Sequence, residues 1–183
     1  NMTGQHSVAN ALATIAAAEH VGVSIETAYE ALSNFGGVKR RMELLGTVRG
    51  VEVYDDFAHH PTAIDTTLEG ARKRLGERKL WAIIEPRSNT MRMGSHKDGL
   101  AHSARLADEV IWYQPEGLDW DLQPVIAAAP NKAVVARTLD DIIHTIVSDA
   151  GEGDAVVIMS NGGFGGLHQK LISALNAEYV VLT

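Results

Sequence analysis

Apolar residues recur at helical spacing in the first part of the chain. Over residues 8–19 they stand three or four positions apart among strong helix formers, and Gly22 follows as a stop signal. Ser24 is a favoured N-cap residue, and the second apolar face that follows it ends at Gly36 and Gly37. The pattern predicts two consecutive helices that form a small helical unit.

Short apolar strands and helices alternate in the rest of the chain. β-Branched and aromatic residues over 48–54 predict a strand or hairpin around Gly50. Further strands are expected over residues 79–84, 109–113, 133–136 and 155–159, and helices over residues 61–75, 100–107, 122–128, 139–150 and 167–175. Continuous apolar strands between helices are typical of a parallel sheet with both faces covered. We therefore predict a Rossmann-like α/β domain, a mostly parallel sheet with helices on both faces, from about Gly46 to the C-terminus.

The composition is close to that of an average globular domain. Of the 183 residues, 45% are hydrophobic and 21% are charged. This length accommodates one domain and a fragment of a second. Asn1 leads almost at once into an Ala-rich helical segment with no strand before it, so we expect the sequence to be part of a longer chain.

Charge and cysteine content exclude several classes of partner. Sixteen Lys and Arg against 23 Asp and Glu give a formal net charge of −7, which argues against nucleic acid or a membrane held by bulk electrostatics. The absence of cysteine excludes disulfides and Cys-based zinc sites and suits a reducing compartment. No apolar run could span a bilayer, and no signal peptide begins the sequence. We expect a cytoplasmic, monomeric protein.

Ligands of open α/β sheets bind beyond the carboxyl ends of the strands, so the loops there form the candidate site. Three of them stand out, over residues 55–61, 85–90 and 160–166. The last is rich in glycine and opens a helix whose N-terminus favours anions, but it matches neither G-x-G-x-x-G nor a P-loop. Alone it is a weak signal, because such turns also arise where strand and helix pack closely.

Two pairs of polar residues follow the first strand of this domain. Asp55 and Asp56 can accept paired hydrogen bonds from ribose hydroxyls or from a cation; the alternative is an N-cap for the helix that starts at Pro61. His59 and His60 are adjacent and point to opposite sides of an extended backbone, so a shared zinc ion is the less favoured interpretation. One imidazole can face a ligand while the other packs inside.

Arg87 follows Glu85 and Pro86 at the end of a buried strand. Arginine is suited to bidentate capture of a carboxylate or phosphate. A surface salt bridge is the alternative, and the residue types alone leave both open.

Three motifs follow one another along the chain. They are Gly4-Gln5-His6-Ser7-Val8-Ala9-Asn10, Gly37-Val38-Lys39-Arg40-Arg41-Met42-Glu43 and Asp55-Asp56-Phe57-Ala58-His59-His60-Pro61. Their order and spacing resemble those of the Mur ligase family over nearly the whole chain. The resemblance implies an ATP-dependent amide ligase, with residues 1–45 as the last helices of a central ATPase domain and residues 46–183 as a C-terminal Rossmann-like domain.

The same resemblance implies a reaction. ATP phosphorylates a carboxylate, an amine attacks the acyl phosphate, and phosphate leaves. The family supplies the neutralising Mg²⁺ and a Lys-bearing phosphate loop from the central domain. That loop is missing from these residues, so the chain alone is expected to be inactive.

Within the family, the third motif resembles that of members acting on UDP-N-acetylmuramate. They add either L-alanine or, in peptidoglycan recycling, the tripeptide L-alanyl-γ-D-glutamyl-meso-diaminopimelate. Members that add L-alanine typically carry Gln-Pro-His-Arg after their second strand, whereas this chain has Glu85-Pro86-Arg87-Ser88-Asn89-Thr90-Met91-Arg92. This departure, together with residues 160–166, favours the tripeptide. L-Alanine addition and a nucleotide-binding module without catalysis are the alternatives.

The resemblance also implies residue roles. Asn10 is expected to contact adenine and Asp56 the ribose hydroxyls, and the whole nucleotide-binding set is His6, Asn10, Arg41 and Asp56. A second set is expected near the peptide and its amine: Phe57, His59, Arg87, Ser88 and Asn89. We assign no catalytic or metal-binding residue within the chain.

Overall fold

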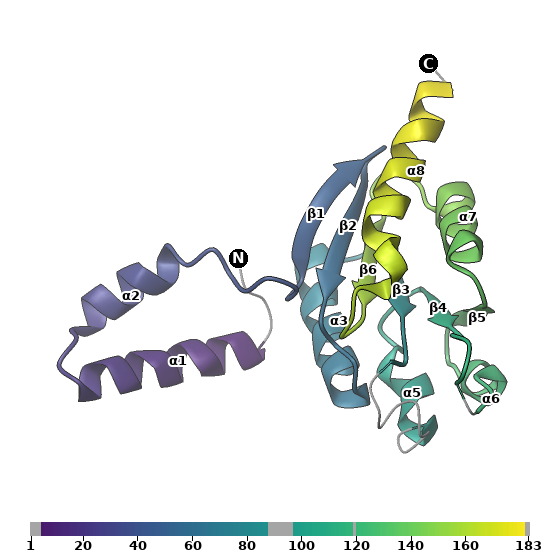
Figure 1. Cartoon of the computed structure of the whole chain (residues 1–183). Coiled ribbons are helices and arrows are strands. Elements are labelled where there is room, and N and C mark those ends of the chain that lie inside the picture. The colour runs from purple at the N-terminus through teal and green to yellow at the C-terminus, as the bar shows by residue number, and fades with distance from the viewer. Residues whose placement is uncertain (1–4, 88–96, 119, 182–183) are drawn as a thin grey trace.

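The structure is a computed structural model that describes residues 5–87, 97–118 and 120–181. The side chains at residues 5, 6, 97, 98 and 178–181 lie outside that description. In the described ranges the chain forms a helical hairpin and a sheet unit, which are joined by a linker over residues 34–42 (Figure 1).

The helical hairpin consists of α1 (Gln5–His20) and α2 (Ile25–Ser33), which pack side by side. Ser24 is the N-cap of α2, because its side-chain oxygen accepts a hydrogen bond from the Thr27 amide at 3.2 Å. Both helices predicted from the sequence are confirmed.

The sheet contains six strands in the order β1-β2-β6-β3-β4-β5. Their bounds are β1 Glu43–Val48, β2 Val51–Asp56, β3 Leu80–Ile84, β4 Glu109–Tyr113, β5 Lys132–Ala136 and β6 Ala155–Met159. Strand β1 pairs antiparallel with β2 through a tight turn at Arg49 and Gly50, which both have positive φ, and all other pairs are parallel. The predicted hairpin and the mostly parallel sheet are confirmed.

Helices cover both faces of the sheet, as predicted (Figure 1). Helices α3, α5 and α6 lie on one face, and α7 and α8 lie on the other. Their bounds are α3 Pro61–Leu75, α5 Lys97–Ser103, α6 Gln123–Ala127, α7 Leu139–Asp149 and α8 Leu167–Val181, with a 3₁₀ turn η1 at Phe164–Gly166. No helix within the described ranges is long and apolar enough to cross a membrane.

One predicted helix ends early. The apolar pattern extended it to residue 107, but α5 ends at Ser103. The carbonyl oxygens of Ala104 and Ala107 accept hydrogen bonds from Asn131 Nδ2, at 2.7 and 2.8 Å. This distant side chain holds the segment in a turn that leads into β4.

Each buried strand contributes side chains to two separate cores, because successive residues point to opposite faces of a sheet. On β3, Ala82 and Ile84 pack toward α3, whereas Trp81 and Ile83 pack toward α7 and α8. These β3 side chains are completely buried. The alternation explains why continuous apolar runs in the sequence become central strands.

The helical hairpin projects away from the sheet unit and leaves apolar side chains exposed (Figure 1). Val8, Leu12 and Tyr29 are 60–67% exposed. The sheet unit begins at Glu43. Gly46, near which the sequence predicted the start of the α/β domain, lies inside β1, opposite Val53.

We expect amide hydrogens of α1 to exchange with solvent much faster than those of β3 and β6. Helix α1 has few buried contacts, so it opens locally, whereas the central strands exchange only on global unfolding. Helix α8 is of similar length and packs on the sheet, so it is the matched control. Hydrogen exchange with mass spectrometry measures the difference, and protection of α1 equal to that of β6 would contradict it.

Candidate ligand site at the carboxyl edge of the sheet

The strand order brings the three candidate loops together. Strand β6 lies between β2 and β3 and runs parallel to both, so all three end at the same edge. Backbone hydrogen bonds continue past the strand ends, from Ser160 N to Asp56 O at 3.1 Å and from Glu85 N to Met159 O at 3.0 Å. The glycine-rich loop after β6 therefore stands between the other two.

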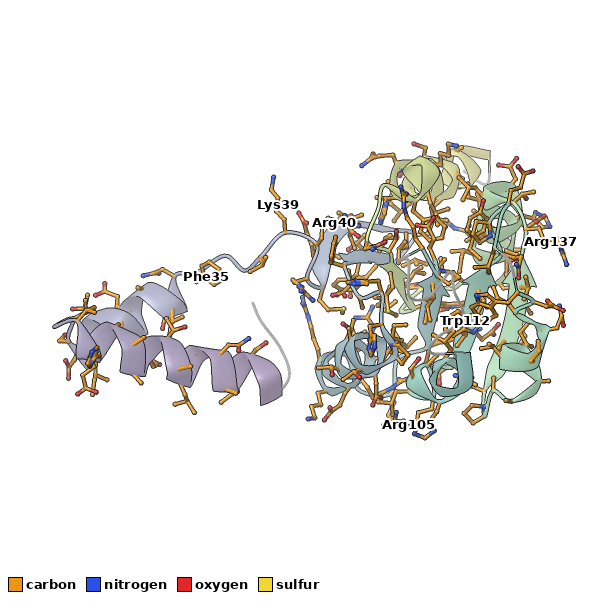
Figure 2. The ribbon with its side chains drawn as sticks, turned by 60° about the horizontal axis from the view of Figure 1, so that its bottom comes forward. Phe35, Lys39, Arg40, Arg105, Trp112 and Arg137 are labelled. Carbon is orange, nitrogen blue, oxygen red and sulfur yellow. The ribbon has the colours of Figure 1, made fainter. Side chains whose placement is uncertain are left out.

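Arg40 of the linker reaches this edge, at the point where the linker meets the sheet unit (Figure 2). Its Nε donates a hydrogen bond to Asp55 Oδ2 at 3.1 Å. Its Nη2 donates to the carbonyl oxygens of Ser160 and Gly162, at 2.5 and 2.8 Å. One guanidinium thus joins the linker, the end of β2 and the loop after β6.

Arg40 was not among the residues selected from the sequence. The basic run Lys39-Arg40-Arg41 offers three candidates, and only Arg41 carried an expectation from the resemblance. In the structure Lys39 and Arg41 are exposed, and Arg40 is the partly buried member of the run. No local pattern distinguishes the three residues, because the hydrogen-bond partners of the Arg40 guanidinium lie 15 to 122 positions away.

Asp55 accepts a hydrogen bond on each of its two carboxylate oxygens. His168 Nε2 donates to Asp55 Oδ1 at 3.1 Å, and Arg40 binds the other carboxylate oxygen. Burial alone would raise the Asp55 pKa, but hydrogen bonds and charge from His168 and Arg40 outweigh that effect and lower it. The prediction that a carboxylate here accepts bonds from a cationic group is confirmed for Asp55.

Asp56 points to the opposite face and holds the linker backbone. Its Oδ2 accepts from Met42 N at 2.9 Å, and its Oδ1 accepts from Ala58 N at 2.8 Å and Thr67 Oγ1 at 3.1 Å. Only 2% of Asp56 is exposed. Burial raises its pKa despite these hydrogen bonds and the positive charge of Arg41.

The N-cap alternative for the two aspartates is wrong. His60 caps α3, because its Nδ1 accepts a hydrogen bond from Thr62 N at 3.3 Å. Ribose binding by Asp56 stays a prediction, and in this structure its carboxylate is bonded within the protein.

The linker adopts an unusual backbone where it is held. Arg40 and Met42 have φ of 59° and 48°, in the left-handed region that non-glycine residues rarely occupy. This backbone conformation costs on the order of 1 kcal/mol for each residue, and it is retained where surrounding contacts hold the residue in place. Arg41 lies between these two residues with its side chain exposed.

Phe57 and His59 pack beside the same linker. The Arg40 Cζ atom lies 5.0 Å from the centre of the Phe57 ring, and the Phe57 and His59 rings meet edge to face at 5.3 Å. His59 Nδ1 donates to the Phe57 carbonyl oxygen at 2.9 Å. The expected place of Phe57 and His59 near the peptide stays a prediction. In this structure Phe57 contacts Arg40 of the linker, and His59 contacts Phe57.

Arg87 lies on the other side of the glycine-rich loop, and its side chain is exposed. The guanidinium rests against Gly162: a Cβ atom added at that glycine would lie 2.5 Å from Arg87 Cζ and 2.7 Å from Nε. Beneath it, Ser160 Oγ donates to Glu85 Oε2 at 2.5 Å. Ser88 and Asn89, also expected here, lie outside the described residues.

The remaining expected nucleotide residues are far from this edge or undescribed. Asn10 is exposed on α1, and the helical hairpin that carries it projects away from the sheet unit (Figure 1). The side chain of His6 lies outside the described residues. The structure therefore gathers Arg40, Arg41 and Asp56 at one place, and it does not bring Asn10 to them.

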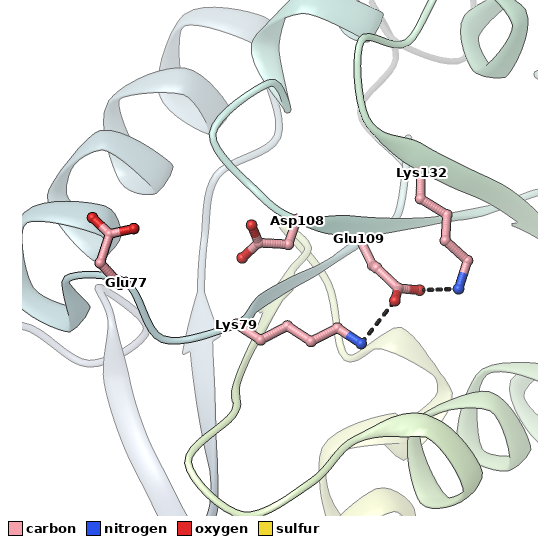
Figure 3. A pocket seen from close by; sticks show the side chains of 5 residues that line it. All are labelled: Glu77, Lys79, Asp108, Glu109 and Lys132. Carbon is pink, nitrogen blue, oxygen red and sulfur yellow. Dashed lines mark ion pairs between the residues drawn. The ribbon is translucent and has the colours of Figure 1, made fainter.

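A second concave region lies at the opposite edge of the sheet, where β3, β4 and β5 begin (Figure 3). Lys79 and Lys132 both pair with Glu109, at 2.8 and 2.7 Å. Glu77 and Asp108 complete the lining. Both lysines that line this region are therefore paired with a carboxylate within the protein. Among the described residues, no group of three or more His, Asp or Glu side chains could hold a metal ion.

We expect Arg40→Ala to lower the free energy of unfolding by about 2–3 kcal/mol, because it leaves a carboxylate and two carbonyl oxygens without their donor. Arg40→Lys keeps the charge but lacks the planar fork, so it should lower the free energy of unfolding by a smaller amount. Arg41→Ala removes an exposed neighbouring side chain and should change the free energy of unfolding by less than about 0.5 kcal/mol. Urea denaturation followed by tryptophan fluorescence gives the values, and equal losses for Arg40→Ala and Arg41→Ala would refute the assignment.

The Asp55 carboxylate makes stability depend on pH. Its folded pKa is below the unfolded value of about 3.9, so ionised Asp55 stabilises the fold above that pH, and this contribution is lost as the pH falls through the folded pKa. As the pH falls from about 5 to about 3, the unchanged chain should lose more of its free energy of unfolding than Asp55→Asn, which has no carboxylate to protonate. Urea denaturation measures the free energy of unfolding at each pH, and the same dependence on pH for both proteins would contradict this prediction.

Comparisons with known proteins identify the family. A family model described as "Mur ligase, glutamate ligase domain" matches residues 40–162. UDP-N-acetylmuramate--L-alanyl-gamma-D-glutamyl-meso-2,6-diaminoheptandioate ligase of Haemophilus influenzae is 46% identical over 97% of this chain and 40% of that protein. A murein peptide ligase structure from Psychrobacter arcticus has a TM-score of 0.76 at 58% identity, over 96% of this chain and 38% of that one.

A relative with a different name is less similar. UDP-N-acetylmuramate--L-alanine ligase of Desulfitobacterium hafniense is 32% identical over 94% of this chain and 40% of that protein. The chain spans about 40% of the length of these relatives. The region matched by the family model begins at Arg40 and ends at Gly162, within the loop after β6. The chain belongs to the Mur ligase family.

Proposed function

We propose that this chain is the C-terminal part of a longer ATP-dependent amide ligase. The enzyme joins L-alanyl-γ-D-glutamyl-meso-diaminopimelate to UDP-N-acetylmuramate in peptidoglycan recycling, and it works in the cytoplasm as a monomer. The observation that carries the proposal is the 46% identity, over nearly the whole chain, to a ligase named for this tripeptide. The relative named for L-alanine addition is 32% identical, and it supports the alternative less well.

In this proposal the two units of the structure belong to different domains. Residues 1–45 are the last helices of the central ATPase domain, and residues 46–183 are the C-terminal domain. The exposed apolar side chains of the helical hairpin fit this division, because they would be covered by the rest of the central domain. ATP and Mg²⁺ are held mainly by that domain, where ATP supplies the phosphoryl group that activates the muramate carboxylate.

The contribution of this chain is to present the peptide. The exposed Arg87 guanidinium at the carboxyl edge can hold a peptide carboxylate in a bidentate geometry. A carboxylate bound there holds the tripeptide at the edge where its amine must meet the acyl phosphate. Phe57 and His59 lie on the linker side of the same edge, where they would contact the peptide and its amine.

Arg41 is the candidate for contact with the nucleotide. Its side chain is exposed between two residues that the sheet unit holds fixed, so the guanidinium projects from a rigid base. Asp56 supports this position through its hydrogen bond to Met42 N. Contact of Asn10 with adenine, which the resemblance implies, requires the helical hairpin and the sheet unit to meet around ATP.

A substrate comparison tests the proposal. The full-length protein is supplied with ATP, Mg²⁺ and UDP-N-acetylmuramate, and phosphate release is measured with the tripeptide or with L-alanine. We expect kcat/KM to be much higher for the tripeptide. A higher value for L-alanine would favour the alternative, and no release with either would favour a binding module.

Replacing Arg87 tests its assignment. In the full-length enzyme Arg87→Ala should lower kcat/KM for the tripeptide roughly ten- to a hundredfold, the loss expected for one charged hydrogen-bonded contact, and leave the KM for ATP nearly unchanged. Arg137 also follows a strand at this edge and is exposed, but it lies at the far end of the sheet (Figure 2). Arg137→Ala is therefore the control, and it should have the kinetics of the unchanged enzyme. A raised KM for ATP with normal tripeptide use would assign Arg87 to the nucleotide instead.

A further inference from the structure

We propose that Gly162 is a positioning residue for the peptide: the space left by its missing side chain sets where the Arg87 guanidinium lies. The proposal rests on the function proposed above and adds a second residue to the peptide side of the site. It concerns a glycine in the middle of a glycine-rich loop, where the sequence gives no reason to single out one position.

Space, and not backbone conformation, distinguishes this glycine from its neighbours. The φ of Gly162 is outside the left-handed region, whereas Gly165 and Gly166 have φ of 56° and 75°. A Cβ atom at residue 162 would overlap the Arg87 guanidinium, at 2.5 Å from Cζ and 2.7 Å from Nε. The arginine therefore occupies the place that any side chain at residue 162 would take.

Gly162 is itself held firmly by both of its peptide groups. Its N–H donates to Ser160 Oγ at 2.9 Å, and that hydroxyl donates to Glu85 Oε2 at 2.5 Å. Its carbonyl oxygen accepts from Arg40 Nη2 at 2.8 Å. The surface beneath Arg87 is thus fixed by the loop after β3 on one side and by the linker on the other.

A methyl group at residue 162 would consequently move Arg87 and leave the loop in place. The bonded glycine backbone is anchored, whereas the guanidinium stands at the end of a flexible, exposed side chain. A displaced guanidinium no longer matches the geometry of a bound carboxylate, and such contacts depend on position within about 1 Å.

The next residue provides a matched control. Gly163 has φ −80° and ψ −3°, which alanine adopts readily, and a Cβ atom added there has nothing within 4 Å. Gly162→Ala and Gly163→Ala thus stiffen the same loop by the same amount. Only the first of them crowds Arg87.

The test compares four variants of the full-length ligase by steady-state kinetics: Gly162→Ala, Gly163→Ala, Arg87→Ala and the double variant Gly162→Ala/Arg87→Ala. We expect Gly162→Ala to raise the KM for the tripeptide about tenfold with kcat and the KM for ATP nearly unchanged, because the contact is made in the ground state and in the transition state. Gly163→Ala should stay within about twofold of the unchanged enzyme. The double variant should be no worse than Arg87→Ala, because Gly162 acts through that arginine.

The outcomes separate this proposal from the one on which it rests. If Arg87→Ala impairs tripeptide use while Gly162→Ala behaves like Gly163→Ala, the positioning role is overturned and the proposed function stands. If Arg87→Ala has no effect, the peptide assignment of Arg87 fails, and the role of Gly162 fails with it. Additive losses in the double variant, or a melting temperature of the Gly162→Ala chain well below that of Gly163→Ala, would mean that Gly162 acts on the loop, and each would overturn the proposal.

Discussion

The Arg40 guanidinium is the contact on which the arrangement of the carboxyl edge depends. A partly buried cation needs partners, and the sheet unit provides a carboxylate from β2 and two carbonyl oxygens from the loop after β6. These bonds fix the direction in which the linker leaves the sheet unit. They also offset the cost of the left-handed backbone at Arg40, and the hydrogen bond from Met42 N to Asp56 does the same at Met42. The exposed Arg41 consequently projects from a rigid segment.

Two adjacent aspartates perform different tasks because successive residues of a strand point to opposite faces. Asp55 faces α8, where His168 joins Arg40 in binding it, and its pKa falls. Asp56 faces α3, where Thr67 and two backbone amides satisfy it, and burial raises its pKa. The linker is therefore held from both faces of one strand, by its side chain at Arg40 and by its backbone at Met42.

The position of β6 between β2 and β3 connects the two halves of the proposed site. The loop after β6 contacts Arg40 on the side of the linker and Arg87 on the side of the peptide. Gly162 takes part in both contacts, and the Ser160–Glu85 hydrogen bond ties the loop to the end of β3. Gly162 thus connects Arg40 of the linker with the surface on which Arg87 rests.

The sequence by itself determined the elements, the class of fold and the family. The periods of the apolar positions are local signals, and so are caps such as Ser24 and the turn at Gly50, which is why the helices, the hairpin and the central strands are found where they were predicted. The end of α5 was missed because a distant side chain, Asn131, decides it. Only the tertiary structure decided the strand order, the choice of Arg40 from a run of three basic residues, and the contact between Arg87 and Gly162. Those features depend on groups 15 to 122 positions apart in sequence, and a local pattern carries no record of which distant residues will meet.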